Sequence, residues 1–282
     1  MNIAKPILYV SKDPERAGGL PCVSGEETLD LLKKVPAGTT VVTFKNNAAI
    51  ERYCKEHGIT LLNPPAELSE KIENKITQAE LFKEFLPDYQ VSKVKDIRMQ
   101  PPFVLQWAHS HSGEGTLYIE DISDIKAKFP ERKCRITKYI EGKTYTVNIV
   151  VGNTIEVGNI SEQLTGIAPY TDNRFTTVGN DWSAPSPKKE IMEMAVKIGT
   201  KMKELGWKGL FGIDVLQGDR LYLIEINARQ PASATYESTL QKTNTVFENH
   251  IKALLGEPLH KHTEITTGKQ ILDRRTMTWI RT

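Results

Sequence analysis

The sequence predicts a mixed fold in which a small α/β layer precedes a larger α+β region. Two observations carry this prediction. Short apolar runs alternate with helical patterns over residues 1–70, which is typical of a parallel α/β layer. From residue 101 onward, strand patterns follow one another across short turns, which favours antiparallel pairing. We therefore expect an α/β unit followed by antiparallel sheets rather than one doubly wound sheet.

The N-terminal unit is expected to contain three strands and two helices. The expected strands are 7–10, 41–44 and 59–62, and the expected helices are 26–34 and 48–57. Gly58 follows the second helix as a stop signal, and Asn63-Pro64-Pro65 ends the third strand. These signals indicate that the unit is complete by residue 66.

The middle of the chain combines a charged helix with a turn rich in glycine and serine. The helical pattern of 69–85 contains Lys75. A strand over 101–107 leads into His109 to Thr116, whose glycines and backbone N–H groups suit a loop that folds over phosphates. An ordinary hairpin loop with solvent-facing His109 and His111 is the alternative.

The second half is expected to contain further strands, two helices and one irregular segment. The expected strands are 117–119, 133–139 and 144–151, the expected helices are 188–205 and 246–255, and the polar segment 161–187 is expected to be irregular. Long irregular segments inside a domain are usually functional. We therefore expect substrate contacts from 161–187.

The most informative pattern is a hairpin over 211–216 and 221–229. Side chains alternate along a strand, so Glu225, Asn227 and Arg229 share one face. A turn of two or four residues pairs Asp214 with Leu223 on that same face. Asp214 and Glu225 are then diagonal neighbours, roughly 7 Å apart at the backbone.

These residue types suit a magnesium site. Mg²⁺ prefers oxygen ligands, usually one or two carboxylates completed by water and phosphate oxygens. Asp214 and Glu225 provide the carboxylates, Asn227 a neutral oxygen, and Arg229 a planar fork of donors for a phosphate or acyl phosphate. The alternative is an exposed strand face with an Arg–Glu pair.

Composition narrows the function classes. Lysine and arginine nearly balance aspartate and glutamate, with a net charge of +2, so we expect no nucleic-acid partner. No apolar run is long enough for a membrane helix or signal peptide, so we expect a cytoplasmic protein without membrane contact. Cys22, Cys54 and Cys134 are too few and too widely spaced for a disulfide framework or zinc site. Oligomeric state is not readable.

Taken together, these pieces resemble the ATP-grasp superfamily, whose members hold ATP between two α+β subdomains. The resemblance implies three units: a pre-ATP-grasp domain over 1–70, a small subdomain with the glycine-rich loop over 71–142, and a large subdomain with the metal-binding hairpin over 143–282. Its most specific motif is Asp214 followed by Glu225-Ile226-Asn227-Ala228-Arg229.

The resemblance also implies ligand roles for individual residues. Asp214, Glu225 and Asn227 would bind magnesium, as one or two ions that Mn²⁺ can replace, and Arg229 would be catalytic. The implied ATP-binding residues on the phosphate side are Lys75, Gln106, Ser112, Gly113, Gly115 and Thr116. Lys138, Tyr139, Ile140 and Glu141 resemble the linker that contacts adenine and the ribose. Two positions depart from the family pattern: Gln106 stands where a phosphate-binding lysine is common, and Thr144 where an acidic residue is frequent.

By this resemblance, the expected activity is that of an ATP-dependent carboxylate–amine ligase. A small-molecule carboxylate would attack the γ-phosphate, and an amine would trap the acyl phosphate, giving an amide, ADP and phosphate. A small-molecule kinase and a nucleotide-binding regulatory protein without turnover remain as alternatives. Arg174, His109 and His111 are further candidates for substrate or loop contacts.

Overall fold

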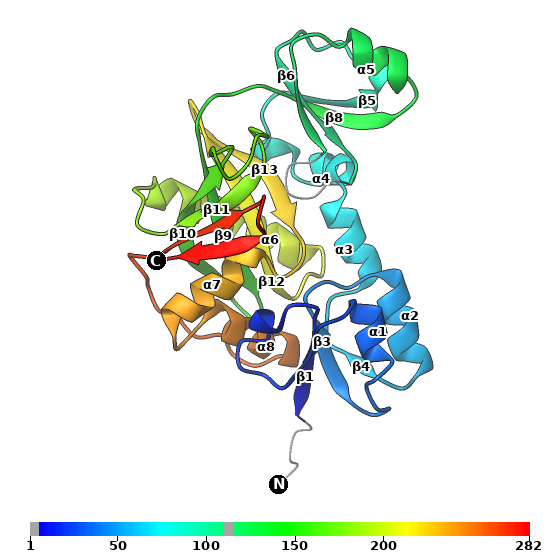
Figure 1. The fold of residues 1–282 in the computed structure, drawn as a ribbon, viewed down its shortest axis with the longest axis vertical. Helices are drawn as coiled ribbons and strands as arrows, with labels where there is room; N and C mark the ends of the chain where they lie inside the picture. The colour runs from blue at the N-terminus through cyan, green and yellow to red at the C-terminus, as the bar shows by residue number, and fades with distance from the viewer. Residues whose placement is uncertain (1–5, 110–114) are drawn as a thin grey trace.

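A computed structural model describes residues 6–109 and 115–282. Its sheets are arranged along the long axis of the molecule (Figure 1). The N-terminal sheet lies at one end, a four-stranded antiparallel sheet at the other, and a seven-stranded sheet between them. This arrangement confirms the predicted mixture of α/β and α+β structure.

The N-terminal sheet is parallel and has the strand order β2-β1-β3-β4. Its strands are β1 (Ile7–Val10), β2 (Cys22–Val23), β3 (Thr40–Thr43) and β4 (Thr60–Leu61). Its helices are α1 (Thr28–Leu32), α2 (Ala48–Glu56) and the short 3-10 helix η1 (Pro14–Ala17). Apolar side chains from α1, α2 and these strands share one core. The alternation predicted from the sequence is therefore confirmed, with shorter helices than expected.

Asn74 divides the helical stretch that follows into two helices. They are α3 (Ala66–Glu73) and α4 (Lys75–Leu81), followed by the 3-10 helix η2 (Lys83–Phe85). Asn74 has an extended backbone, and its side chain accepts a hydrogen bond from the backbone N–H of Ile76, as asparagine does at a helix N-cap. The predicted helical stretch 69–85 is therefore divided between two helices rather than formed by one. Lys75 is the first residue of α4 instead of lying in the interior of a longer helix.

The small antiparallel sheet has the order β5-β8-β6-β7. Its strands are β5 (Tyr89–Lys93), β6 (Phe103–Trp107), β7 (Thr116–Ile119) and β8 (Lys133–Lys138), with the 3-10 helix η3 (Val94–Asp96) and α5 (Ser123–Lys128) between them. The sequence analysis missed β5 and α5. Because β8 inserts beside β6, Gln106 and Arg135 are directly opposite each other.

The seven-stranded sheet is antiparallel and has the order β13-β12-β9-β10-β11-β14-β15. Its strands are β9 (Lys143–Val151), β10 (Ile155–Thr165), β11 (Thr177–Asp181), β12 (Gly209–Gln217), β13 (Leu221–Asn227), β14 (Lys269–Asp273) and β15 (Thr278–Arg281). The expectation of an irregular 161–187 was wrong for 161–165 and 177–181, because the end of β10 pairs with β11 there. The C-terminal strands β14 and β15 were not predicted.

Three helices pack against this sheet: α6 (Lys188–Glu204), α7 (Ala232–Gln241) and α8 (Val246–Leu255). The predictions for α6 and α8 are confirmed, whereas α7 was missed. Within the described residues, no helix combines the length and apolar character needed to cross a membrane.

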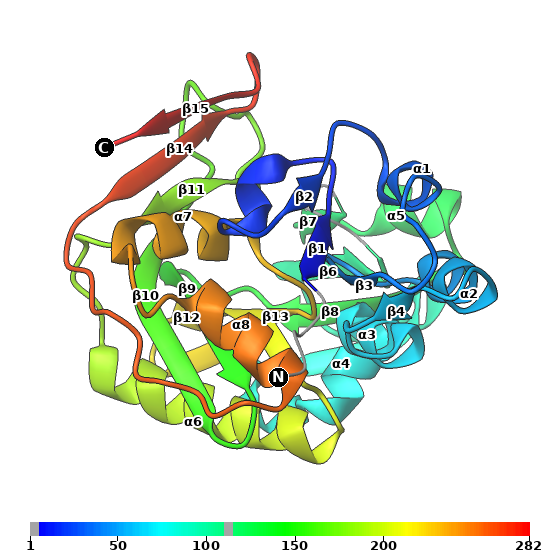
Figure 2. The same cartoon turned by 90° about the horizontal axis from the view of Figure 1, so that it is seen from below.

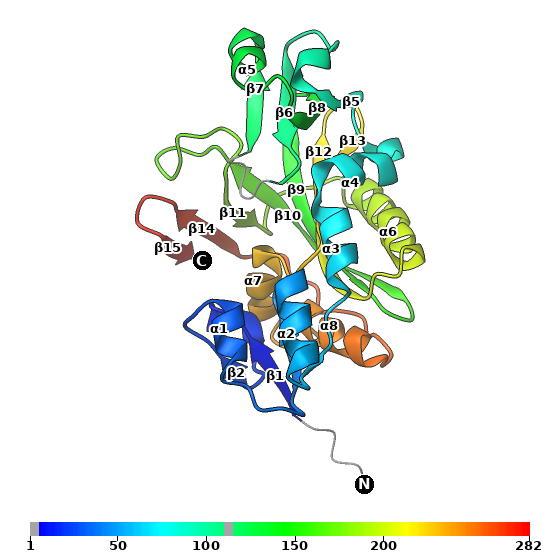
Figure 3. The same ribbon diagram turned by 90° about the vertical axis from the view of Figure 1, so that its right-hand side faces the viewer.

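The two faces of the large sheet differ, and this difference places the site. Tyr145, Val147 and Ile149 point to one face of β9 and pack with α6 in the main core. Thr144 and Thr146 point to the other face and line a cleft. Figure 3 shows α6 on one side of this sheet, and Figure 2 shows it crossing below the strands. The face of the large sheet that carries Thr144 and Thr146 therefore offers polar side chains to a ligand.

Candidate active site

A cleft of about 240 Å³ lies on the polar face of the large sheet, where β6 and β7 of the small sheet also contribute to its wall. It brings together six of the residues predicted from the sequence. They are Gln106, Thr116, Asp214, Glu225, Asn227 and Arg229. Residues from two separate sheets therefore share one cavity.

The β12–β13 register differs from the predicted one in a way that preserves the face. The loop has three residues, Gly218 to Arg220, because Gln217 pairs with Leu221. A bulge then shifts the register once more, so Asp214 pairs with Glu225 rather than with Leu223. One shift alone would move Asp214 to the opposite face, but two restore it. The predicted diagonal pair is therefore a directly opposed pair.

The opposed carboxylates of Asp214 and Glu225 repel each other, and this repulsion adds to the effect of burial on the pKa of Asp214. Asp214 is buried, and burial, with the nearby Glu225 charge, raises its pKa from 3.8 to about 6. Hydrogen bonds oppose the shift: Thr146 Oγ1 donates to Asp214 Oδ1 at 2.8 Å, and Asn227 Nδ2 donates to Oδ2 at 3.3 Å. A cation between the carboxylates would relieve the repulsion.

This donor set fits a hard divalent cation. Asp214 and Glu225 offer carboxylate oxygens and Asn227 an amide oxygen, the ligand types that Mg²⁺ prefers. Within residues 6–109 and 115–282, no three or more His, Cys, Asp or Glu side chains group to hold a metal ion. A cation here would therefore take its remaining ligands from water or from a phosphate.

Lys75 reaches this carboxylate pair from α4. Its ammonium group forms an ion pair with Glu225 Oε1, and its side chain is only 2% exposed. The sequence placed Lys75 near phosphates, and the structure places it beside the metal-binding candidates. A buried lysine needs such a partner, because an unpaired ammonium group is costly away from water.

Arg229 lies at the end of β13 with an acidic partner that the sequence analysis missed. Arg229 Nη1 is 2.6 Å from Glu73 Oε1, and Lys45 pairs with Glu73 Oε2. Burial by itself raises the pKa of Glu73, but the charges of Arg229 and Lys45 outweigh it and leave that pKa lowered. The N-terminal unit is attached here too, since Gln230 N donates to Phe44 O at 3.0 Å.

The loop that was expected to cover phosphates is described only in part. Ser112, Gly113 and His111 lie outside the described residues. Gly115 O accepts from Trp107 N at 3.2 Å, and Thr116 belongs to β7, directly opposite Gln106, rather than to the loop. Gln106 Nε2 is 3.4 Å from Thr116 Oγ1, so both side chains meet at the cleft wall.

The segment expected to contact adenine does not line this cleft. Lys138 ends β8, and Tyr139, Ile140 and Glu141 connect it to β9. A Cβ on Gly142 would lie 2.1 Å from Gln217 O, so this connection runs close against the end of β12. The adenine role of these four residues stays a prediction.

Arg174 joins the two sheets next to Phe175, which lines the cleft. Its guanidinium lies 4.5 Å from the Tyr118 ring centroid and 5.5 Å from that of Tyr139, and Nη2 is 3.4 Å from Tyr139 Oη. The two tyrosine rings contact edge to face at 4.8 Å. Arg174 follows β10 in the large region, whereas Tyr118 belongs to β7. The three side chains, which we name the Arg174 clasp, therefore bridge the sheets.

We expect Arg174→Ala to weaken ATP binding about twofold to fivefold, because an exposed cation–π contact contributes about 0.5–1 kcal/mol. The change should leave turnover at saturating ATP unaltered, since none of the three clasp side chains lines the cleft that holds the carboxylate pair. Titration of the variant with nucleotide measures the effect. Arg275→Ala is the matched control, because Arg275 is exposed and pairs with Asp273, away from the cleft lining. Equal losses in both variants would contradict a role for the clasp.

The remaining candidates have ordinary contacts. His109 Nε2 is 3.1 Å from Glu70 and lies near Asn74, at the exposed start of the glycine-rich loop. Thr144 lines the cleft and donates to Gln163 O at 3.1 Å. Thr144 therefore supplies a hydroxyl where the family often has an acid.

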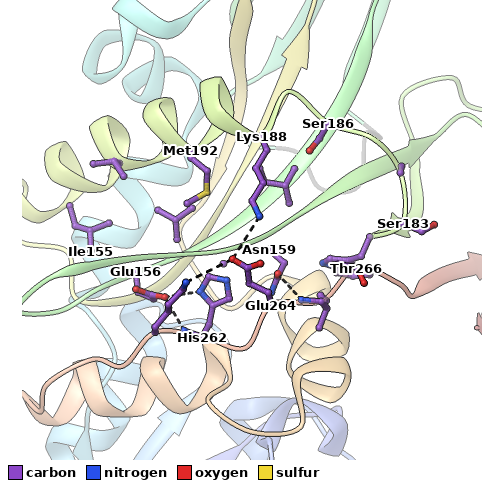
Figure 4. A pocket seen from close by; sticks show the side chains of 18 residues that line it. Ile155, Glu156, Asn159, Ser183, Ser186, Lys188, Met192, His262, Glu264 and Thr266 are labelled. Atoms are coloured by element: carbon purple, nitrogen blue, oxygen red, sulfur yellow. Dashed lines mark hydrogen bonds and ion pairs between the residues drawn. The ribbon is translucent and has the colours of Figure 1, made fainter.

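A larger cavity of about 690 Å³ lies away from these residues, between β10, α6 and the segment 261–266 (Figure 4). Its charged side chains already pair with one another. Glu156 accepts from His262 at 2.6 Å, and Glu264 lies 3.8 Å from Lys188. This cavity contains no opposed carboxylates comparable to Asp214 and Glu225.

Comparison with known proteins agrees with this geometry. The family model of the ATP-grasp domain matches residues 72–233, more than half of the 282 residues. Formate-dependent phosphoribosylglycinamide formyltransferase of Wolinella succinogenes is 24% identical over 168 residues, 56% of this chain and 42% of that protein. Tyramine–L-glutamate ligase of Methanocaldococcus fervens is 32% identical over 94 residues, 33% of this chain and 30% of that protein. The chain thus matches less than half the length of either curated relative.

Solved structures share the fold across nearly the whole chain. Carboxyaminoimidazole ribonucleotide synthase from Aspergillus clavatus, complexed with ATP, superposes with a TM-score of 0.69 at 14% identity. The match covers 95% of this chain and 81% of that one. Identity this low speaks only to the fold, but the family match includes Lys75, Asp214, Glu225 and Arg229. The chain belongs to the ATP-grasp family.

Proposed function

We propose that this protein is an ATP-dependent ligase that activates a small-molecule carboxylate as an acyl phosphate and joins it to an amine. One observation carries the proposal. Asp214, Glu225, Asn227 and Arg229 share a cleft with Gln106 and Thr116 of a second sheet, and Lys75 pairs with Glu225. Family membership supports ATP as the nucleotide.

The residues divide the work of phosphoryl transfer. Asp214, Glu225 and Asn227 would hold Mg²⁺, which when bound neutralises phosphate charge. Lys75, which pairs with Glu225, and Arg229 would supply donors to the phosphates, and the substrate carboxylate would lie near Arg229. In this proposal the phosphoryl group passes directly between two bound molecules, and no side chain of the protein acts as a nucleophile.

The substrates are proposed only by class. A carboxylate and an amine are consistent with a cleft whose wall mixes threonines, Asn180 and Arg274 with Phe175 and Trp279. The three-unit division at residues 70 and 142 also stays a proposal, with ATP bound between the second and third units.

An ADP-release screen with pooled carboxylates and amines tests the proposal. We expect ADP only when a carboxylate is present, an amide when the amine is added, and a hydroxamate when hydroxylamine replaces the amine. A stable phosphorylated product without hydroxamate would identify a kinase instead. MgATP binding without ADP release from any pool would favour a regulatory protein.

A further inference from the structure

Arg135 is a buried cation without a carboxylate partner. It lies in β8 with 1% exposure, and among the described residues no carboxylate oxygen is within 4.0 Å of its guanidinium. Its hydrogen-bond acceptors are neutral: Gln106 Oε1, Gln78 Oε1 and Ile224 O. Burial lowers its pKa to about 10, and the charge of Glu225 partly opposes this shift. Buried charges are usually paired, but Glu225 forms its ion pair with Lys75 and not with Arg135.

The charge around the cleft favours an anionic ligand. Lys75 and Arg135 lie beside the strand that carries Glu225, opposite Asp214. Two further arginines, Arg229 and Arg274, line the cleft. A divalent cation between the carboxylates would leave a surplus of positive charge. A polyphosphate is the kind of anion that neutralises such a surplus.

Gln106 connects this buried charge to the cleft. Arg135 Nε and Nη2 both donate to Gln106 Oε1, at 3.1 and 2.5 Å. This fork fixes the amide oxygen toward β8 and leaves Nε2 on the side of Thr116. Gln106 lines the cleft, whereas Arg135 does not. The guanidinium also polarises the amide, which strengthens Nε2 as a donor.

We propose that Arg135 and Gln106 form one phosphate-binding unit, in which Gln106 Nε2 contacts a nucleotide phosphate and Arg135 supplies the charge behind it. Gln106 is the contacting residue, and Arg135 is a positioning residue that acts through it. The inference rests on the proposed ATP site. It assigns the phosphate-binding charge to β8 rather than to β6.

Arg135 also has a structural role that a test must separate. Its Nη2 donates to Ile224 O at 2.7 Å, and its Nη1 lies 3.3 Å from Gln78 Oε1. Gln78 Nε2 in turn donates to Ile226 O at 3.1 Å. These bonds hold β13 on both sides of Glu225. Loss of Arg135 can therefore disturb the metal ligands as well as the nucleotide grip.

Nucleotide titration of the full chain separates the two roles. We expect Arg135→Met to bind MgATP at least about tenfold more weakly, equivalent to about 1.4 kcal/mol, with adenosine affinity unchanged. The double variant Gln106→Lys with Arg135→Met restores a charge at the cleft wall and should recover MgATP affinity to within about threefold of wild type. Arg132→Met is the matched control, because Arg132 stacks on Trp107 at 3.9 Å and does not line the cleft.

Gln106→Leu tests the unit without removing Arg135, in case Arg135→Met does not fold. This variant should also bind MgATP more weakly and adenosine as well as wild type does. Where both single variants fold, the double variant Gln106→Leu with Arg135→Met should bind MgATP no more weakly than the weaker single variant. Wild-type MgATP affinity in folded Arg135→Met or Gln106→Leu would overturn the proposal. So would a folded Lys/Met double variant as weak as Arg135→Met. Wild-type protein that binds MgATP but ligates nothing would contradict the ligase proposal and leave this test intact.

Discussion

Glu225→Gln is expected to reduce magnesium-dependent ADP formation about a thousandfold and to lower the stability of the fold. Activity falls because Glu225 is one of only two carboxylates in the opposed pair. Stability falls because Lys75, 2% exposed, loses its ion-pair partner. Breaking this pair should cost about 2–3 kcal/mol, below the usual range for fully buried pairs because the Glu225 side chain is 24% exposed.

ADP release against magnesium concentration and thermal melting measure the two effects. Asp219→Asn is the matched control, because Asp219 lies in the β12–β13 turn and accepts from Tyr222 at 2.8 Å. That variant should keep its activity. Full magnesium-dependent turnover in Glu225→Gln would remove Glu225 from the metal site.

Asp214→Asn should abolish the same activity while making the metal-free protein more stable at pH 8. The ionised Asp214 is unfavourable in the fold, since burial and then Glu225 raise its pKa from 3.8 to about 6. This rise in pKa corresponds to about 3 kcal/mol of free energy of unfolding that the protein loses when Asp214 is ionised. Asparagine keeps the shape and can still accept from Thr146.

The sign follows from linkage. Because the folded pKa is raised, the protonated carboxyl favours the folded state below pH 3.8, and this contribution is lost as the pH rises to about 6. The difference in free energy of unfolding between Asp214→Asn and wild type should therefore be absent near pH 3.8, increase toward pH 6 and then stay constant. Melting curves in a chelator across this range measure it. A gap that is largest at low pH would contradict the raised pKa.

The two variants are informative together. Both are expected to remove the proposed metal site, yet to move stability in opposite directions at pH 8. Unfolding therefore cannot explain a shared loss of activity. Saturating Mg²⁺ should stabilise wild type by binding the folded state, and should stabilise neither variant.

The shared face of Asp214 and Glu225 could be predicted from sequence because alternation along a strand depends only on the backbone. Their exact pairing could not. The bulge at Ile224 lies beside Arg135 and Gln78. These side chains donate hydrogen bonds to the backbone carbonyls of Ile224 and Ile226, in addition to the strand–strand hydrogen bonds of β13. Such contacts come from elements distant in sequence, and no local pattern reveals them.

The same reasoning explains the other differences. Arg135 is one of three basic residues in β8, and its role depends on β8 pairing beside β6. The division into two helices at Asn74 could have been predicted, because asparagine is favoured at helix N-caps. The strong helical pattern on both sides of Asn74 favoured one helix instead. The C-terminal strands join the sheet through β11, about 90 residues upstream of them. Local sequence therefore predicted element types better than their partners.

Glu73 gives Arg229 a freedom that an ordinary ion pair lacks. The carboxylate has two cations, Lys45 on one oxygen and Arg229 on the other. If a phosphoryl group draws Arg229 away, Glu73 keeps Lys45 and is not left as an isolated buried charge. The arginine can therefore change partners at little electrostatic cost. Because Lys45 follows β3, the N-terminal unit provides the counter-charge that makes this exchange reversible.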